Sequence, residues 1–113
     1  SGSSGLDRQF VKGGATTVIL AILCDQPMHG YELIRTIRDR SQGILDFSDG
    51  TVYPLLYNLR DKGLIASRAA TSTSGRRRKI YEITEAGRTI LAQKLEDWTL
   101  FSRGMELALG RVK

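Results

Sequence analysis

The segment from residue 64 to residue 84 constrains the fold most, because it alternates as β-strands do around one polar turn. Two short runs, LIASRAA and RKIYEIT, are separated by TSTSG and two arginines. In the second run Tyr81 and Ile83 fall on one side of an extended chain, and Ile80 and Glu82 fall on the other. The sequence therefore predicts a two-stranded hairpin.

Three short helices are expected before this hairpin. The first covers about Phe10 to Cys24 and is apolar almost all round in its second half, which indicates burial from several sides. The DQP sequence that follows ends it, because the residue before a proline disfavours the helical region. The second and third helices are expected over Gly30–Ser41 and Ser48–Gly63, with apolar residues at helical spacing. These residues are Leu33, Ile34 and Ile37 in the second helix and Val52, Leu55, Leu56 and Leu59 in the third.

A long helix is expected after the hairpin. Thr84 is suited to cap its start, and the helical pattern runs to about Leu109. Its apolar residues recur at roughly heptad spacing and present more apolar surface than three short helices can cover from one side. A second copy of the chain would cover that surface, so the pattern predicts a homodimer. The predicted interface residues are Leu91, Leu95, Trp98, Phe101 and Met105.

Length and composition exclude several classes of protein. The 113 residues fit a single globular unit, and the net charge of +5 favours a polyanionic partner. One cysteine and one histidine leave no disulfide framework, no metal-binding cluster and no nucleophile–base set, and no glycine-rich phosphate loop is present. The sequence therefore predicts neither an enzyme nor a cofactor.

The chain is expected to be a cytoplasmic protein without membrane association. Its longest apolar run, VILAILC, is too short to cross a bilayer, and no signal-peptide cleavage site follows it. We expect residues 1–5 (SGSSG) to be a linker left from recombinant expression, residues 6–83 to form one domain and residues 84–113 to form the dimerisation helix.

Three helices followed by a hairpin make the plan of a winged helix-turn-helix, in which the third helix enters the DNA major groove and the hairpin is the wing. The predicted fold class is thus mainly α with a small β-hairpin, plus a long C-terminal helix. Residues 76–79 (RRRK) place four cations beside the wing turn, where they can neutralise phosphates. We expect Arg76 and Arg77 to contact DNA near the tip, and Arg78 to pair with the protein's own carboxylates.

The outer face of the third helix is the predicted recognition surface. Ser48 and Thr51 offer hydroxyl groups beside the free backbone N–H groups of the first turn, which suit phosphate contacts. Tyr53 and Tyr57 lie one turn apart and are expected to reach phosphates or base edges. The alternative for either tyrosine is packing on a neighbouring helix.

Three segments together resemble the PadR family of bacterial transcriptional regulators: PMHGYELI, SDGTVYPLLYNLRDKGLI and GRRRKIYEITEAGR. They match the order and spacing of that family across about Val18 to Leu109. The resemblance implies a homodimeric repressor that binds double-stranded DNA at a palindromic operator. It also implies DNA contacts by seven residues, which are Ser48, Thr51, Tyr53 and Pro54 in the recognition helix and Arg76, Arg77 and Lys79 in the wing.

The resemblance also implies a ligand site at Trp98, because multidrug-sensing relatives hold flat aromatic compounds between tryptophans at this place in the helix. From the residue alone, Trp98 is interpreted as an anchor of the dimer interface, which is the alternative to the ligand site. Two other functions stay open: a winged-helix protein-interaction module without DNA binding, and a small-molecule carrier. His29 is expected to make a capping or turn hydrogen bond, and Cys24 is expected to be a packing residue.

Overall fold

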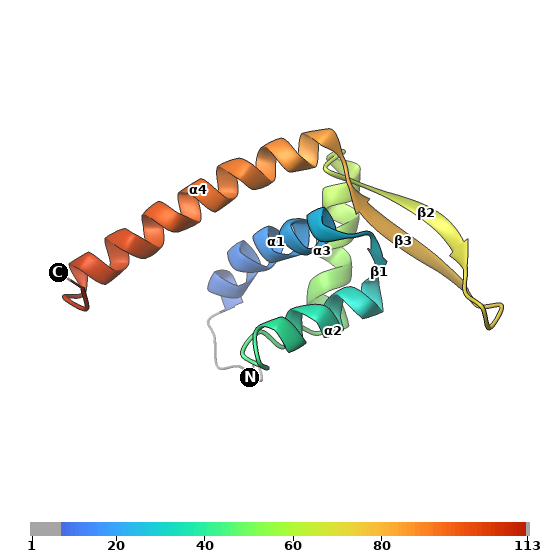
Figure 1. The fold of residues 1–113 in the computed structure, drawn as a ribbon, viewed down its shortest axis with the longest axis horizontal. Coiled ribbons are helices and arrows are strands. Elements are labelled where there is room, and N and C mark those ends of the chain that lie inside the picture. The colour runs from blue at the N-terminus through green and yellow to red at the C-terminus, as the bar shows by residue number, and fades with distance from the viewer. Residues whose placement is uncertain (1–7, 113) are drawn as a thin grey trace.

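The computed structural model describes residues 8–112 of the chain, and their side chains from residue 13 onward. Helices α1 (Arg8–Asp25), α2 (Gly30–Arg40) and α3 (Asp49–Asp61) precede strands β2 (Ile65–Thr71) and β3 (Arg77–Ile83) and the long helix α4 (Glu85–Ala108) (Figure 1). The predicted mainly helical class with a hairpin and a long last helix is confirmed. The predicted linker, residues 1–5, lies outside the described residues.

The sheet has a third strand that the sequence did not predict. Strand β1 (Met28–His29) pairs antiparallel with β3, so that Met28 faces Tyr81 and His29 faces Ile80. The strand order is therefore β1-β3-β2, with β3 in the centre. A strand of two residues carries no alternating pattern, which is why the sequence gives no sign of it.

The core lies between the three short helices and the inner side of the sheet. Tyr81 and Ile83 of β3 are buried there, as their alternation predicted. The buried sets predicted for α2 and α3 are also confirmed, except that Leu55 is only partly buried. Each fully buried leucine or isoleucine stabilises the fold by about 1.5–3 kcal/mol. Helix α1 contributes Ala15, Ile19, Leu20, Ile22 and Leu23.

The hairpin closes through a short turn that depends on glycine. The register of β2 and β3 ends at Thr71 opposite Arg77. Beyond it the Ser72 amide donates to the Arg76 carbonyl oxygen at 2.8 Å, and the Gly75 amide donates to the Ser72 carbonyl oxygen at 2.9 Å. Gly75 has φ +85°, a left-handed conformation that favours glycine. The TSTSG run therefore forms the predicted turn.

Helix α3 begins and ends close to the predicted residues. Ser48 occupies the N-cap position, but its hydroxyl group does not cap the backbone and lies 3.3 Å from the Thr51 hydroxyl oxygen instead. At the other end the Gly63 amide donates to the Arg60 carbonyl oxygen and the Leu64 amide donates to the Leu59 carbonyl oxygen. With Gly63 at φ +76°, this is a Schellman motif.

Thr84 joins the end of α3, the sheet and the start of α4. Its hydroxyl group donates to the Gly63 carbonyl oxygen at 2.7 Å and accepts from the Gly87 amide at 3.1 Å, which confirms the predicted cap. Its own amide donates to the Leu64 carbonyl oxygen at 3.1 Å. Gly87 lets α4 approach this segment, because a β-carbon there would lie 2.0 Å from the Leu64 carbonyl oxygen.

Helix α4 leaves the rest of the molecule after its first two turns and projects far beyond it (Figure 1). Leu91 is 6% exposed and belongs to the core of its own chain, so it lies apart from the other predicted interface residues. Leu95, Trp98, Phe101 and Met105 are exposed. No helix in residues 8–112 is both long and apolar enough to span a membrane.

The close approach at Gly87 predicts a large effect of a small substitution. Gly87→Ala is expected to lower the free energy of unfolding by about 1–3 kcal/mol, because the new methyl group collides with the Leu64 backbone. Gly104→Ala, in the same helix with open space around it, is the control and is expected to raise stability by up to about 1 kcal/mol. Urea unfolding followed by circular dichroism, at one protein concentration for all variants, measures both. Equal stability of Gly87→Ala and the parent chain would contradict the described packing.

Candidate nucleic-acid interface

The outer face of α3 carries the side chains that the sequence predicted for recognition. Ser48 and Pro54 are exposed and Thr51 is partly exposed. The Thr51 and Val52 amides already donate to the Ser48 carbonyl oxygen, so the unpaired amides of the helix start are those before them. Asp49 lies in this first turn, where its carboxylate stabilises the helix dipole but repels a phosphate.

The two tyrosines of α3 lie in different surroundings. Tyr53 is partly buried against Gly30, where a β-carbon would lie 2.5 Å from the tyrosine hydroxyl oxygen. Burial raises the pKa of Tyr53, and Asp49 and Tyr57 raise this pKa further. Tyr57 is 44% exposed. Packing on a neighbouring helix, the alternative considered for either tyrosine, is therefore what Tyr53 does, and Tyr57 is the one open to solvent.

An arginine lies over the exposed tyrosine. The Arg60 guanidinium carbon is 5.3 Å from the centre of the Tyr57 ring, a distance typical of a cation–π contact. The Tyr53 and Tyr57 rings are 6.2 Å apart. Arg60 was not among the predicted site residues. The outer face of α3 thus has a guanidinium group beside an aromatic ring, and the same group lies 3.8 Å from a carboxylate oxygen of Asp61.

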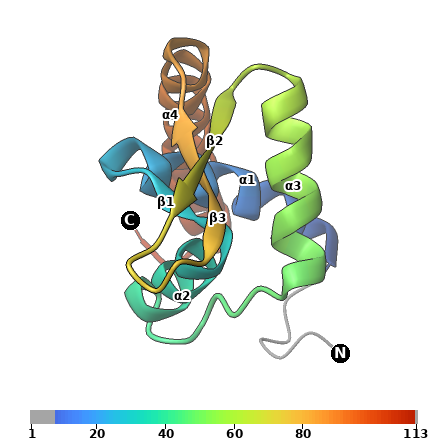
Figure 2. The same ribbon diagram turned by 90° about the vertical axis from the view of Figure 1, so that its right-hand side faces the viewer.

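The wing presents three of its four cations to solvent. Arg76, Arg77 and Lys79 are exposed, and none of their side chains forms an ion pair within residues 8–112. The tip of the hairpin and the start of α3 lie toward the same end of the molecule (Figure 2). Both features are therefore available to a single elongated polyanion lying across that end.

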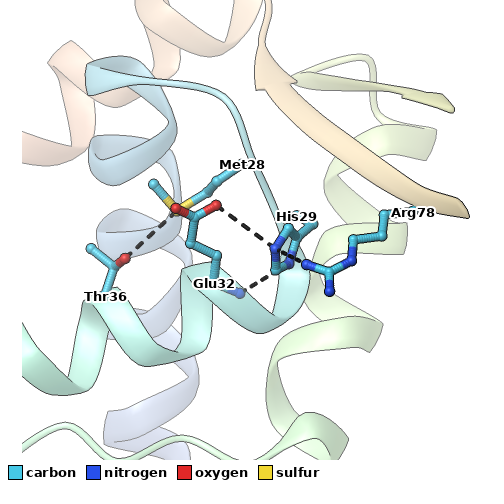
Figure 3. A network of polar contacts seen from close by, with 5 residues as sticks. All are labelled: Met28, His29, Glu32, Thr36 and Arg78. Atoms are coloured by element: carbon cyan, nitrogen blue, oxygen red, sulfur yellow. Dashed lines mark hydrogen bonds and ion pairs between the residues drawn. The ribbon is translucent and has the colours of Figure 1, made fainter. Parts of the chain in front are cut away.

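The fourth cation turns toward the protein. Arg78 is partly buried, and its NH1 atom lies 2.6 Å from Nε2 of His29 (Figure 3). The expected partner was a carboxylate, and the partner in the structure is the imidazole ring. The pairing of β1 with β3, which the sequence does not indicate, brings the two side chains together. Nδ1 of His29 lies 3.2 Å from the Glu32 amide nitrogen, which is the position of the predicted cap of α2.

Cys24 is partly buried and packs against the core, as predicted. The Arg88 NH1 atom donates to its sulfur atom at 3.1 Å, so a cation does lie beside the thiol. This contact could not be predicted from the sequence, because Arg88 is in α4, far along the chain from Cys24. The described residues contain no cluster of three His, Cys, Asp or Glu side chains that would hold a metal ion.

The projecting part of α4 forms a second candidate site. The Trp98 and Phe101 ring centres are 6.4 Å apart with planes inclined by 38°, and the Trp98 side chain is 51% exposed. At about 100° per residue, Leu95, Trp98, Phe101 and Met105 lie on one side of the helix. Leu91 continues that side into the core. The apolar side of α4 is thus covered by its own chain at one end and open to solvent beyond.

Comparison with known proteins agrees with this architecture. The model of the Transcriptional regulator PadR-like family matches residues 19–93. The chain is 38% identical over 96 residues to the transcriptional regulator YqjI of Escherichia coli (strain K12); the match covers 85% of this chain but only 42% of that protein. It is 31% identical over 86 residues to the transcriptional regulator Rv3488 of Mycobacterium tuberculosis, which covers 76% of this chain and 77% of the relative.

Solved structures show the same fold. A PadR-like transcriptional regulator of Bacillus cereus has a TM-score of 0.78 and 31% identity, and the match covers 89% of this chain and 96% of that one. A transcriptional regulator of Clostridium thermocellum has a TM-score of 0.80 and 28% identity, with coverage of 87% and 95%. The family model spans most of the chain, and the solved structures agree with it. The chain therefore belongs to the PadR-like family of transcriptional regulators.

Proposed function

We propose that the chain is a cytoplasmic homodimeric repressor that binds a palindromic operator in double-stranded DNA and leaves it when a small aromatic ligand binds. The observation that carries the proposal is the wing with three exposed cations at the same end of the molecule as the start of α3. A cationic hairpin beside a helix with exposed polar groups fits a winged helix-turn-helix on duplex DNA.

The contacts divide into two kinds. Arg76, Arg77 and Lys79 neutralise phosphates, which gives affinity without sequence preference. The exposed side chains of α3 read the major groove, and Tyr57 is the strongest candidate because it is exposed and carries Arg60 beside it. Ser48 and Thr51 position the helix start on the backbone, and Pro54 fits the groove surface. Tyr53 acts mainly by holding α3 against α2.

The exposed apolar side of α4 supports the homodimer. Leu95, Trp98, Phe101 and Met105 would remain in water in a monomer, and pairing of two such helices removes them from it. A two-fold axis through the paired helices sets the two recognition helices symmetrically. Their half-sites then lie about 34 Å apart, one turn of DNA, which calls for a palindromic operator.

Trp98 supports the ligand part of the proposal. Its exposed ring and the tilted Phe101 ring form an aromatic surface on the dimer side of α4. Across a two-fold axis that surface occurs twice, and a planar aromatic molecule can stack between the copies. A ligand that binds the DNA-free arrangement better must lower the affinity for DNA by the same factor as DNA lowers the affinity for the ligand.

The salt dependence of DNA binding tests the wing. Binding to a duplex of about 30 base pairs is expected to weaken with salt, with a slope near −0.9 per contacted phosphate. Arg76→Ala and Arg77→Ala are each expected to flatten that slope by about one unit. Arg103→Ala removes the same charge from the exposed surface of α4 and is the control, with an unchanged slope expected. A negligible slope in the parent chain would favour the protein-interaction module instead.

A charge placed on the apolar side of α4 tests the dimer. The parent chain is expected to have about twice the chain mass of 12.5 kDa in sedimentation equilibrium, and Leu95→Glu is expected to be monomeric because a buried carboxylate is costly. Gln93→Glu adds the same charge to the opposite side of the helix and is expected to stay dimeric. A monomeric parent chain, or a dimeric Leu95→Glu, would contradict the assigned interface.

Dye titration tests the ligand site. Trp98 is the only tryptophan, so planar aromatic dyes that stack on it are expected to quench the protein's tryptophan fluorescence. Trp98→Ala is expected to weaken dye binding followed by the dye's own emission. Saturating duplex DNA is expected to weaken dye binding to the parent chain. A dye affinity that does not change when DNA is added would indicate a small-molecule carrier. The absence of any quenching would show that Trp98 is not part of the ligand site.

A further inference from the structure

The imidazole ring of His29 is contacted from two sides by groups of different elements. On one side Nδ1 lies 3.2 Å from the Glu32 amide nitrogen in the first turn of α2. On the other, Nε2 lies 2.6 Å from NH1 of Arg78 in β3 (Figure 3). The His29 side chain is only 19% exposed. The ring therefore forms a bridge between the helical half of the molecule and the strand that carries the wing.

The register of the sheet explains why these side chains meet. His29 is paired with Ile80, and Arg78 precedes Ile80 by two residues on the same face of β3. Diagonal neighbours on adjacent antiparallel strands lie within reach of long side chains. The β1–β3 ladder is only two residues long. The side-chain bridge therefore extends a short backbone ladder toward the tip of the wing.

A neutral imidazole has one N–H group and one lone pair, but both neighbours of this ring are donors. The Glu32 amide and the Arg78 guanidinium therefore compete for one acceptor nitrogen. The guanidinium is charged and its contact is the shorter one. The favoured neutral tautomer therefore carries its proton on Nδ1, and Nε2 accepts a hydrogen bond from Arg78. A doubly protonated ring has no lone pair and accepts from neither group. Its nearest carboxylate oxygen is Oε1 of Glu32, 3.9 Å from Nε2.

We propose that His29 is a positioning residue for the wing: its neutral ring holds Arg78 and so fixes β3, and protonation of the ring releases the wing and weakens DNA binding. This inference rests on the proposed function, because it assigns the wing to DNA. Holding Arg78 against the protein fixes the rotation of β3 about its axis. That rotation sets the direction in which Arg77 and Lys79, on the other face of the strand, leave the wing.

The charged groups around the ring support loss of the His29–Arg78 contact at low pH. The pKa of His29 lies below its usual value of 6.5, first because the ring is buried and then because of the Arg78 charge. Arg35 lowers this pKa further, Glu32 raises it, and the Tyr31 ring is stacked 6.5 Å away. Because the pKa is lower in the folded chain than in the unfolded one, the bridge is complete above pH 6.5. It is lost as the pH falls through the folded value.

Two substitutions separate the two contacts of the ring. The amide oxygen of asparagine lies where Nδ1 lies, so His29→Asn keeps an acceptor for the Glu32 amide and loses the one for Arg78. The longer glutamine places its oxygen near Nε2, so His29→Gln keeps the acceptor for Arg78. Neither side chain titrates. The pair is therefore a matched test of the bridge against the helix cap.

The first measurement is the affinity for a duplex of about 30 base pairs at pH 8 and at a series of lower pH values, at constant ionic strength. At pH 8 His29→Asn and Arg78→Met are expected to bind about ten-fold more weakly than the parent chain, and His29→Gln about equally well. Once the pH falls below the pKa of His29, as found from its own ring-proton titration, the ratio for His29→Asn is expected to approach one. His29 is the only histidine, so few other groups titrate in this range.

The second measurement needs no DNA. The ring protons of the single histidine give one nuclear magnetic resonance titration curve, and the backbone amide shifts of residues 72–79 are expected to follow that curve. In His29→Gln these amide shifts are expected to stay constant with pH. Arg78→Met is expected to raise the pKa of His29, since it removes one of the groups that lower it.

The outcomes separate the inference from the proposed function. Amide shifts in β3 that ignore the histidine titration would overturn the positioning role, whether or not the protein binds DNA. A parent chain that fails to bind the duplex at low salt would overturn the proposed function alone, and the amide shifts would still decide the bridge. Loss of affinity in His29→Gln but not in His29→Asn would assign the effect to the α2 cap. Equal loss in both variants would assign it to the missing ring rather than to either hydrogen bond, and either result would overturn the inference.

Discussion

Strand β3 pairs with β1 on one side and with β2 on the other, and this double pairing is the constraint on which the rest of the structure depends. Alternation places Arg77, Lys79, Tyr81 and Ile83 on one face of the strand. Tyr81 and Ile83 enter the core, and Arg77 and Lys79 continue the same face beyond the point where the core ends. The seven-residue strand β3 thus fixes where the cationic tip lies relative to the helical core. A slip of one residue would exchange the two faces and destroy both the core and the wing.

Most of the fold could be predicted because its signals are local. The helical spacing of apolar residues placed α2 and α3 to within a few residues. Glycine and small polar residues also placed the end of α3 and the wing turn, where Gly63 and Gly75 are left-handed in the structure. The role of the wing cations could also be predicted, because adjacent like charges repel one another and do not stabilise a fold by themselves. Exposure of Arg76, Arg77 and Lys79 follows from their place near the tip.

The features that the sequence did not reveal all depend on contacts between distant segments. The two residues of β1 are too few to show a period, and without β1 nothing brings His29 to Arg78. Leu91 fits the heptad pattern of α4 as well as Leu95 does, and only the packing of α4 on α1 separates the buried leucine from the exposed one. Periodicity shows which side of a helix is apolar, but it does not show how far along the helix that side is packed against the rest of the chain.

The junction at Thr84 decides how a signal from α4 would reach DNA. Its hydroxyl group bonds both the end of α3, at Gly63, and the start of α4, at Gly87. The close contact of Gly87 with the Leu64 carbonyl group leaves this corner no room to slide. In the proposed dimer, a ligand that rotates the paired α4 helices would therefore carry each α3 with it as a rigid body. If this dimer binds two half-sites a fixed distance apart, as proposed, a small rotation at its axis would be enough to move the recognition helices out of position on the DNA.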